Sequence, residues 1–473
     1  MFEPITLPGW LVACLVLAAA WLVLERLLVP GVRWFVRRRI NRVLEEANTK
    51  LQIHVQPFKL TKRKVLIDRL LYDPQVLEAA EVFGRSHDMP REVVMRRVEK
   101  YAREIVPSFN AYVYFRFGYW VSRRLVNALF RVRLGYADAE ALQAVSPDST
   151  IVFVMNHRSN MDYLLVSYLV AERTALSYAV GEWARIFPLE SLLRSMGAFF
   201  VRRKSRNDLY RRVLARYVGM ATQEGVTQAV YPEGGLSRDG RLGEPKLGLF
   251  DYMLRSFDPE GARDLVFVPV GLNYDRVLED RTLLLDLDDD APRKRGLAAL
   301  TTAIGFWSKN FRLWMAGRWY RFGYACVNFG TPISMRSYLA RRDLDLRSLD
   351  RSSRFQRVAE LARELMRQVG AVVPVVPVSL VATVLLRAPD RQWTKLEIKT
   401  EVCELMADLR SLGAHVYVPR SNDDYAIEVG LRMLTLRRVV VEEQGLFTTR
   451  PEELRLLSYY ANSIGHLLEP SSP

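Results

Sequence analysis

One stretch of sequence decides the fold: Ile151-Val152-Phe153-Val154-Met155-Asn156-His157-Arg158-Ser159-Asn160-Met161-Asp162-Tyr163-Leu164-Leu165. Its first five residues are apolar, the next seven are mostly polar, and the last three are again apolar or aromatic. This order predicts a buried strand that ends in a polar turn and continues as a helix. Turns at the ends of buried strands commonly carry the reactive groups of α/β proteins, so this turn is a candidate site.

His157 and Asp162 are the two residues of the turn with acid–base chemistry. On one continuous helix their side chains would point about 140° apart and would not meet. With His157 on the turn and Asp162 in the first helical turn, the carboxylate can fold back onto the imidazole. An acceptor on one ring nitrogen leaves the other free as a general base. The alternative is a plain capping turn, made by Ser159 or Asn160, with His157 as a surface group.

Composition places the chain among globular proteins that bind an acidic partner. The 473 residues are too many for one ordinary core, which favours a main domain with additions. A hydrophobic content of 49% excludes a disordered chain. The formal net charge of +15 predicts attraction to nucleic acid, anionic lipid or an acidic protein. The three cysteines, Cys14, Cys326 and Cys403, are far apart and fit a reducing compartment.

The N-terminal residues 1–32 are predicted to be a membrane anchor. Every residue from Trp10 to Leu24 is apolar, close to the roughly 20 residues that a spanning helix needs. Arginines follow this run and none precedes it, which predicts a catalytic domain on the cytoplasmic face of the cell (inner) membrane. An in-plane interfacial helix and a buried core helix are the alternatives.

Residues 33–135 are predicted to form basic, membrane-proximal helices. Between Phe109 and Trp120 aromatic residues alternate with Arg116, and Arg123 and Arg124 follow. This interleaving suits either stacked bases or an amphipathic helix in a lipid interface. The expected anchor favours membrane phospholipid as the partner and not nucleic acid.

Residues 136–345 are predicted to be an α/β domain with a mainly parallel central sheet covered by helices. Strand-like runs at 176–180, 197–201, 227–231, 265–272 and 324–329 alternate with helical patterns at 207–223, 246–257 and 297–313. Residues 346–473 are predicted to be mostly helical, with helices at 355–369 and 395–412, a short strand at 437–441 and a last helix.

Three of the predicted strands carry further polar groups or a proline. Arg202 and Arg203 end one strand and suit a phosphate, with structural ion pairing as the alternative. Tyr231-Pro232-Glu233-Gly234-Gly235-Leu236-Ser237-Arg238 ends another, and its glycines allow a backbone close to a ligand or a plain surface turn. Pro269 interrupts a third and is expected at an edge, a bulge or a strand end.

Taken in order, the sequences HRSNMD, GAFFVRR, YPEGGLSR and VPVGLNYD resemble the four blocks of the glycerolipid acyltransferases with the H-x4-D motif. The resemblance is nearest to the bacterial glycerol-3-phosphate 1-O-acyltransferases and is strong over residues 107–332. Beyond that it is loose, through residues 374–386. It implies transfer of a fatty acyl group from acyl-CoA or acyl-ACP to the 1-hydroxyl of glycerol 3-phosphate, which gives lysophosphatidic acid for phospholipid biosynthesis.

The resemblance also implies residue roles. His157 would be the general base and Asp162 its orienting partner. No metal and no cofactor is expected. The substrate-binding residues would be Arg158, Ser159, Arg202, Arg203, Glu233, Gly234, Gly235, Ser237, Arg238 and Pro269.

Two departures from the family pattern leave alternatives open. Leu236 stands where close relatives usually have a basic residue, so an acyltransferase for lysophosphatidate or dihydroxyacetone phosphate is the first alternative. The region before the histidine block is much shorter than in typical bacterial members, which leaves the mode of membrane docking open. A non-catalytic lipid-binding membrane protein is the second alternative.

Overall fold

The computed structural model describes residues 56–170, 174–181, 185, 189–202, 205, 207–255, 257–285 and 321–469. The predicted anchor over residues 1–32, the predicted helix at 297–313 and Arg203 lie outside these residues. Within the described ranges, no helix combines the length and the apolar character needed to cross a membrane.

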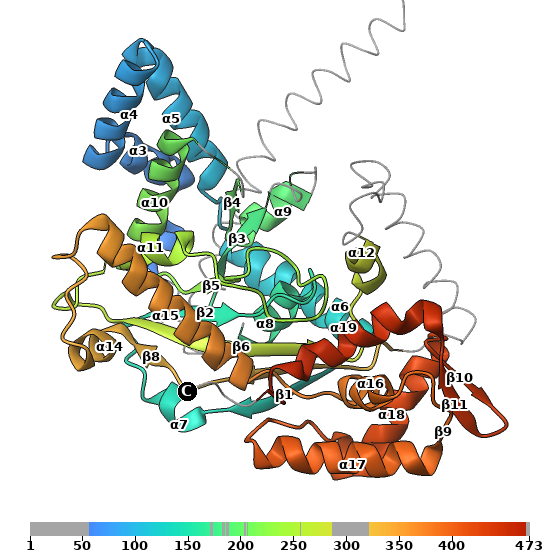
Figure 1. Ribbon diagram of the computed structural model, residues 1–473. Coiled ribbons are helices and arrows are strands. Elements are labelled where there is room, and N and C mark those ends of the chain that lie inside the picture. The colour runs from blue at the N-terminus through green and yellow to red at the C-terminus, as the bar shows by residue number, and fades with distance from the viewer. Residues whose placement is uncertain are drawn as a thin grey trace, which may run out of the picture.

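The centre of the molecule is a mostly parallel eight-stranded sheet, which confirms the α/β prediction (Figure 1). Its order is β1-β7-β6-β2-β5-β3-β4, with β8 beside β6. Only the β6–β7 and β6–β8 pairs are antiparallel. The strands are β1 Arg131–Ala137, β2 Thr150–Met155, β3 Ser177–Gly181, β4 Ala198–Val201, β5 Gln228–Val230, β6 Leu265–Tyr274, β7 Tyr324–Phe329 and β8 Ile333–Ser334.

The edge strand β1 was not predicted. Its sequence alternates arginine with apolar residues, and most of its side chains are exposed although its backbone pairs with β7. An exposed edge strand lacks the buried apolar run by which the other strands were recognised.

Helices precede, separate and follow the strands, and several begin at capping side chains. Asp73, Asn207 and Asp350 each accept backbone N–H groups at a helix start, and Thr394 and Glu397 form a capping box. The helices before the last sheet strand are α2 Pro57–Leu60, α3 Arg63–Leu71, α4 Pro74–Ser86, α5 Arg91–Ile105, η1 Val113–Gly118, α6 Tyr119–Leu129, α7 Ala139–Gln143, α8 Asp162–Val170, α9 Leu189–Ser195, α10 Asp208–Gln223, α11 Gly248–Leu254 and α12 Asp280–Leu285.

The C-terminal region is mostly helical, as predicted, with a small antiparallel sheet in the order β10-β11-β9. The predicted helices at 355–369 and 395–412 are confirmed as parts of α15 and α17. The elements are α14 Met335–Arg341, α15 Arg351–Ala371, α16 Pro377–Arg387, β9 Trp393–Thr394, α17 Lys395–Ser411, η3 Pro419–Ser421, α18 Asp423–Leu436, β10 Val440–Glu443, β11 Leu446–Thr449, η4 Pro451–Glu453 and α19 Leu454–Gly465.

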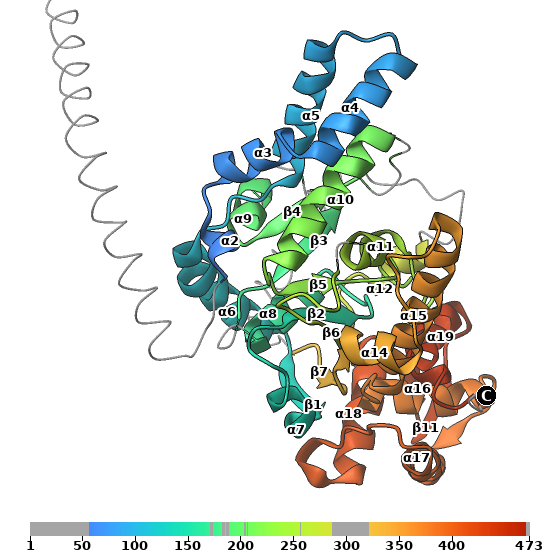
Figure 2. The same ribbon diagram turned by 90° about the vertical axis from the view of Figure 1, so that its left-hand side faces the viewer.

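The sheet separates two hydrophobic cores, because successive side chains of a strand point to opposite faces. Val152 and Val154 of β2 pack with α3–α5, α10, α11 and α15. Phe153 and Met155 pack on the other face with α6, α8 and α16–α19. The views in Figures 1 and 2 show these two layers of helices. The C-terminal helices α16–α19 therefore share a core with the strand that leads to His157.

Pro269 lies inside β6, which corrects the expectation of an edge, a bulge or a strand end. It pairs in register with Val154 of β2. On its other side β8 pairs only with residues 266 and 267, and β7 only with residues 270–274. Pro269 falls between these two partners, where its carbonyl accepts from Gly330 N at 2.8 Å. The interruption in pairing explains how an interior strand tolerates a residue without an N–H.

Candidate active site

The turn after β2 brings His157 and Asp162 together. Asp162 is the first residue of α8, and its Oδ2 lies 2.9 Å from Nδ1 of His157. The Asp162 side chain is fully buried, whereas that of His157 is 13% exposed. None of the described residues hydrogen-bonds Nε2 of His157. The pair therefore has the geometry of a candidate general base, with its outer nitrogen left unbonded by the described residues.

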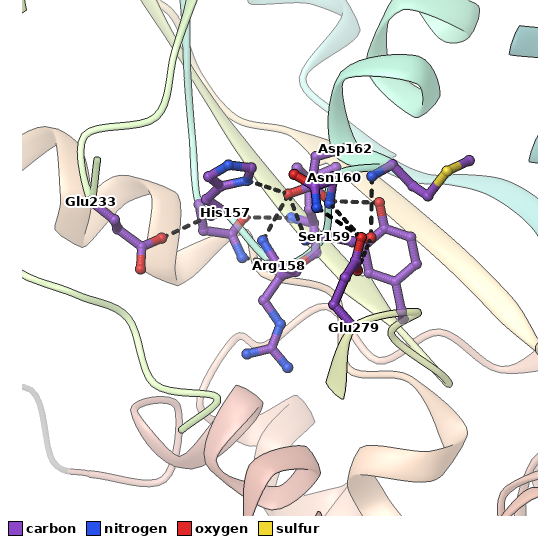
Figure 3. A network of polar contacts seen from close by, with 11 residues as sticks. His157, Arg158, Ser159, Asn160, Asp162, Glu233 and Glu279 are labelled. Atoms are coloured by element: carbon purple, nitrogen blue, oxygen red, sulfur yellow. Dashed lines mark hydrogen bonds and ion pairs between the residues drawn. The ribbon is translucent and has the colours of Figure 1, made fainter. Parts of the chain in front are cut away.

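Asp162 also organises the turn itself. Its Oδ2 accepts the backbone N–H groups of Arg158 at 2.7 Å and Ser159 at 3.0 Å (Figure 3). These two bonds curve the backbone around the carboxylate and keep His157 on the turn. The imidazole can therefore reach Asp162 although the two residues are five positions apart. These contacts are all local in the sequence.

Tyr274 holds the second oxygen of Asp162. Its hydroxyl donates to Oδ1 at 2.6 Å from the last residue of β6, two strand positions beyond Leu272. Burial, together with the Asp162 charge, raises the pKa of the Tyr274 hydroxyl, which keeps it a donor. Sequence reasoning assigned no role to Tyr274, although it lies in the fourth block, VPVGLNYD.

Glu233 ties the third block to the backbone of His157. Its Oε1 accepts from His157 N at 2.8 Å, and its Oε2 accepts from Gly243 N at 3.0 Å. Ser237 N donates to the carbonyl of His157 at 2.9 Å. Burial raises the pKa of the Glu233 carboxyl, and the two backbone N–H donors oppose that rise. Glu233 thus fixes the position of the base.

Glu279 is a second carboxylate at the turn, and sequence reasoning missed it. It accepts from Ser159 Oγ at 2.8 Å, from Asn160 Nδ2 at 3.0 Å and from Asn160 N at 3.3 Å (Figure 3). Burial raises its pKa, and these donors oppose the rise. The hydroxyl of Ser159 is therefore held by protein.

Tyr231 packs directly on the candidate base. Its ring stacks on the His157 imidazole with centroids 4.1 Å apart and planes 23° apart. The Tyr231 hydroxyl is buried, and no described residue hydrogen-bonds it. The stacking restricts rotation of the imidazole, as the Asp162 bond does from the other side.

Arg158 points toward the C-terminal region. Its side chain is buried, and Nη1 donates to the carbonyl of Gly240. The guanidinium lies 4.7 Å from the ring centroid of Tyr459 on α19. Arg158 thus links the first block, the loop of the third block and the last helix, and its role in substrate binding stays a prediction.

The other residues predicted to bind substrate do not all lie at the His157 turn. Arg202 follows β4, the end strand of the sheet, and binds Glu104 through two bonds of 2.7 Å. This is the structural ion pair that the sequence left open as an alternative. Ser237 donates to the carbonyl of Arg241 at 2.7 Å, Arg238 is exposed on the same loop, and Gly235 is half-buried. Their substrate roles stay predictions.

Two family models match the chain. Residues 137–273 match the model described as Acyltransferase, and residues 312–472 match the one described as Glycerol-3-phosphate acyltransferase C-terminal region. Both matches agree with the resemblance of the ordered blocks to the glycerolipid acyltransferases. The second match extends well past the segment at 374–386 that sequence reasoning recognised.

Curated relatives match more of this chain than either family model and carry a specific enzyme name. Proteins named glycerol-3-phosphate acyltransferase match from Pseudomonas paraeruginosa PA7, with 32% identity over 91% of this chain and 51% of the relative, and from Xanthomonas axonopodis pv. citri, with 27% identity over 92% and 49%. One from Pseudomonas putida is 27% identical over 90% of this chain and 52% of its own length. The chain therefore spans about half the length of the curated relatives it matches.

Solved structures also match the chain. One of them is the 1-acyl-sn-glycerophosphate acyltransferase PlsC of Thermotoga maritima, with 16% identity, a TM-score of 0.32, and coverage of 65% of this chain and 98% of that one. A TM-score of this size is too low to establish a shared fold.

Proposed function

We propose that the chain transfers a fatty acyl group from an acyl thioester, acyl-CoA or acyl-ACP, to the 1-hydroxyl of glycerol 3-phosphate, giving lysophosphatidic acid. The observation that carries the proposal is the His157–Asp162 pair at 2.9 Å, held by Tyr274 and Glu233 with Nε2 left for a substrate. The printed names of the curated relatives support the choice of acceptor.

The geometry fits direct transfer without an acyl-enzyme. Nε2 of His157 takes the proton of the acceptor hydroxyl while its oxygen attacks the thioester carbonyl carbon. The tetrahedral intermediate collapses with cleavage of the C–S bond, and the leaving thiolate takes the proton from the imidazolium. Asp162 stabilises that transient cation through Nδ1. A neutral imidazole can accept such a proton, which is why histidine is the commonest general base in enzymes.

The resemblance assigns Arg202, Arg203 and Arg238 of the second and third blocks to the substrate. Because Glu104 binds Arg202, the acceptor phosphate would be bound by Arg203 and Arg238. Arginine suits this role because its planar fork can donate two hydrogen bonds to a phosphate. An Arg203→Ala variant should raise the KM for glycerol 3-phosphate with a smaller effect on kcat. An unchanged KM would place the phosphate elsewhere.

A panel of acceptors tests the reaction, with acyl-CoA and acyl-ACP as donors to the purified protein. The expected result is the highest kcat/KM for glycerol 3-phosphate. A higher value for lysophosphatidate or dihydroxyacetone phosphate would overturn the acceptor, and Leu236 is the observation that keeps these acceptors in the panel. No transfer to any acceptor would favour a non-catalytic lipid-binding protein.

We also infer a membrane-docking face on η1 and α6. Arg116, Phe117, Trp120, Arg123 and Arg124 are all exposed and recur every three or four residues, which places them on one side of the helix. Phe117 is 49% exposed and Trp120 is 55% exposed, and the face carries no acidic residue. Large exposed aromatics flanked by arginines suit the interface of an anionic membrane.

One pair of packed helices connects the docking face to the turn that carries His157 and Asp162. α6 packs against α8, the helix that begins at Asp162 (Figure 1). The rings of Tyr119 on α6 and Tyr168 on α8 lie 5.9 Å apart. Docking here would hold the site near the bilayer that supplies acyl groups and takes the product. The proposed location is the cytoplasmic face of the cell (inner) membrane.

Hydrogen exchange on the full chain tests the docking face, because it reports on each segment separately. Vesicles with anionic phospholipid should protect residues 113–129, whereas purely zwitterionic vesicles should protect them less, since each cation near an anionic surface contributes about 1 kcal/mol. The exposed surface of α17 serves as the internal control. Equal exchange of residues 113–129 with and without anionic vesicles would refute the face.

A further inference from the structure

Lys246 lies against the glycine turn of the third block. Gly234 has a φ of +67°, and a Cβ built on it would meet the Lys246 side chain at 2.6 Å from Cδ and 2.9 Å from Nζ. The backbone N–H of Lys246 donates to the carbonyl of Pro232 at 2.8 Å. The lysine is therefore fixed to the turn by its backbone and extends over Gly234, where only a glycine leaves room.

This position adjoins the candidate base. Gly234 follows Glu233 in the chain, so their Cα atoms are about 3.8 Å apart, and the Glu233 carboxylate holds the backbone N–H of His157. The segment that leads to Lys246 is bonded to the same carboxylate, because Gly243 N donates to Glu233 Oε2 at 3.0 Å. One carboxylate thus joins the strand end of His157 to the loop that carries Lys246.

The Lys246 ammonium is available to bind an anionic ligand. The side chain is exposed, and no described aspartate or glutamate forms an ion pair with it. An exposed cation on the loop that is bonded to Glu233, the partner of the His157 backbone, suits an anionic substrate group.

Leu236 places an apolar side chain in this turn. By the resemblance it stands where close relatives usually have a basic residue, and its partly buried side chain packs against the hydrophobic core. The third block therefore lacks a charge at its own position 236, ten residues before Lys246. The loop from Ser237 to Pro245 returns the chain to Gly234 and brings Lys246 there.

We propose that Lys246 binds the phosphate of the acceptor and replaces the charge that the third block lacks at Leu236. This inference rests on the proposed acylation of a phosphorylated acceptor and assigns one of its binding groups. Lysine binds phosphate as a point charge with three donors, so it needs no fixed orientation. The hydrogen-bonded turn at Gly234 supplies the positioning that a flexible side chain lacks.

The test compares Lys246→Ala, Lys246→Arg and, as a matched control, Lys64→Ala on the exposed surface of α3. Lys246→Ala should raise the KM for glycerol 3-phosphate about tenfold or more, the size expected for a lost charged hydrogen bond, with a smaller change in kcat. Lys246→Arg should recover most of the affinity, and Lys64→Ala should match the wild type. An unchanged KM in folded Lys246→Ala protein would overturn the inference.

Calorimetry separates this inference from the proposed function. Glycerol 3-phosphate and inorganic phosphate are titrated into the wild-type protein and into Lys246→Ala, with glycerol as the uncharged comparison. Weaker binding of both phosphates to Lys246→Ala supports the inference even if no acyl transfer is detected. Equal binding to both proteins, or no phosphate binding to the wild type, overturns it whatever the activity.

Discussion

Tyr274→Phe removes one hydroxyl from the catalytic turn and leaves the aromatic ring. The hydroxyl donates to Asp162 Oδ1 at 2.6 Å, and both groups are buried. Oδ2 keeps its three donors, which are His157 Nδ1 and the backbone N–H groups of Arg158 and Ser159. The variant should therefore fold, with a carboxylate that is held at one oxygen and free at the other.

The expected cost follows from the kind of bond that is lost. A hydrogen bond to a charged group contributes about 1.5–3 kcal/mol, and its loss here leaves a buried carboxylate oxygen without that donor. If the same energy is lost from the transition state, in which Asp162 steadies the imidazolium, kcat falls about 10- to 150-fold. KM for the acceptor should change little, because Tyr274 reaches the substrate only through Asp162 and His157.

The assay is steady-state acyl transfer, together with urea denaturation to measure the free energy of unfolding. Tyr231→Phe is the matched control: it also removes a buried hydroxyl beside His157, but one that no described residue hydrogen-bonds. Its kcat and stability should stay close to those of the wild type. Equal kcat in the two variants would refute the idea that Tyr274 positions Asp162.

Two predictions concern groups away from the turn. Burial raises the pKa of Asp275 to about 7, against an ordinary value of 3.8. This group therefore favours the folded state most below pH 4, and its contribution falls as the pH rises toward 7. In Asp275→Asn the change in unfolding free energy between pH 5 and pH 8 should be about 2–3 kcal/mol smaller than in the wild type. Urea denaturation at the two pH values measures this change, and an equal change in both proteins would contradict the raised pKa of Asp275. Arg202→Ala should lower the free energy of unfolding by about 1–3 kcal/mol, because Glu104 loses a bidentate partner; unchanged stability would argue against a structural role for this pair.

The sequence predicted the parts of the site that local chemistry determines. His157 and Asp162 are five residues apart on one turn, and the apolar run before them identifies the strand that carries them. Glu233 lies at the end of another predicted strand, and adjacent parallel strands bring such ends together. The helices predicted at 207–223, 355–369 and 395–412 were recognised for the same reason, since apolar periodicity is local.

The remaining parts depend on contacts between distant segments. Tyr274 meets Asp162 across 112 residues, and Glu279 meets Ser159 across 120. A tyrosine at a strand end and a glutamate in a loop give no signal of such partners. Arg202 shows the opposite case. The sequence suggested that it binds a phosphate, but in the structure it pairs with Glu104, which lies 98 residues earlier in the chain. Lys246 could be recognised only once the turn at Gly234 had a defined shape.

The central claim is that His157, oriented by Asp162, is the base that activates the acceptor hydroxyl. The most direct measurement is the rate of acyl transfer by His157→Ala protein that is shown by circular dichroism to be folded. The predicted result is a loss of about 10²- to 10⁴-fold, the contribution of a positioned general base. Wild-type activity in the folded His157→Ala protein would contradict the mechanism.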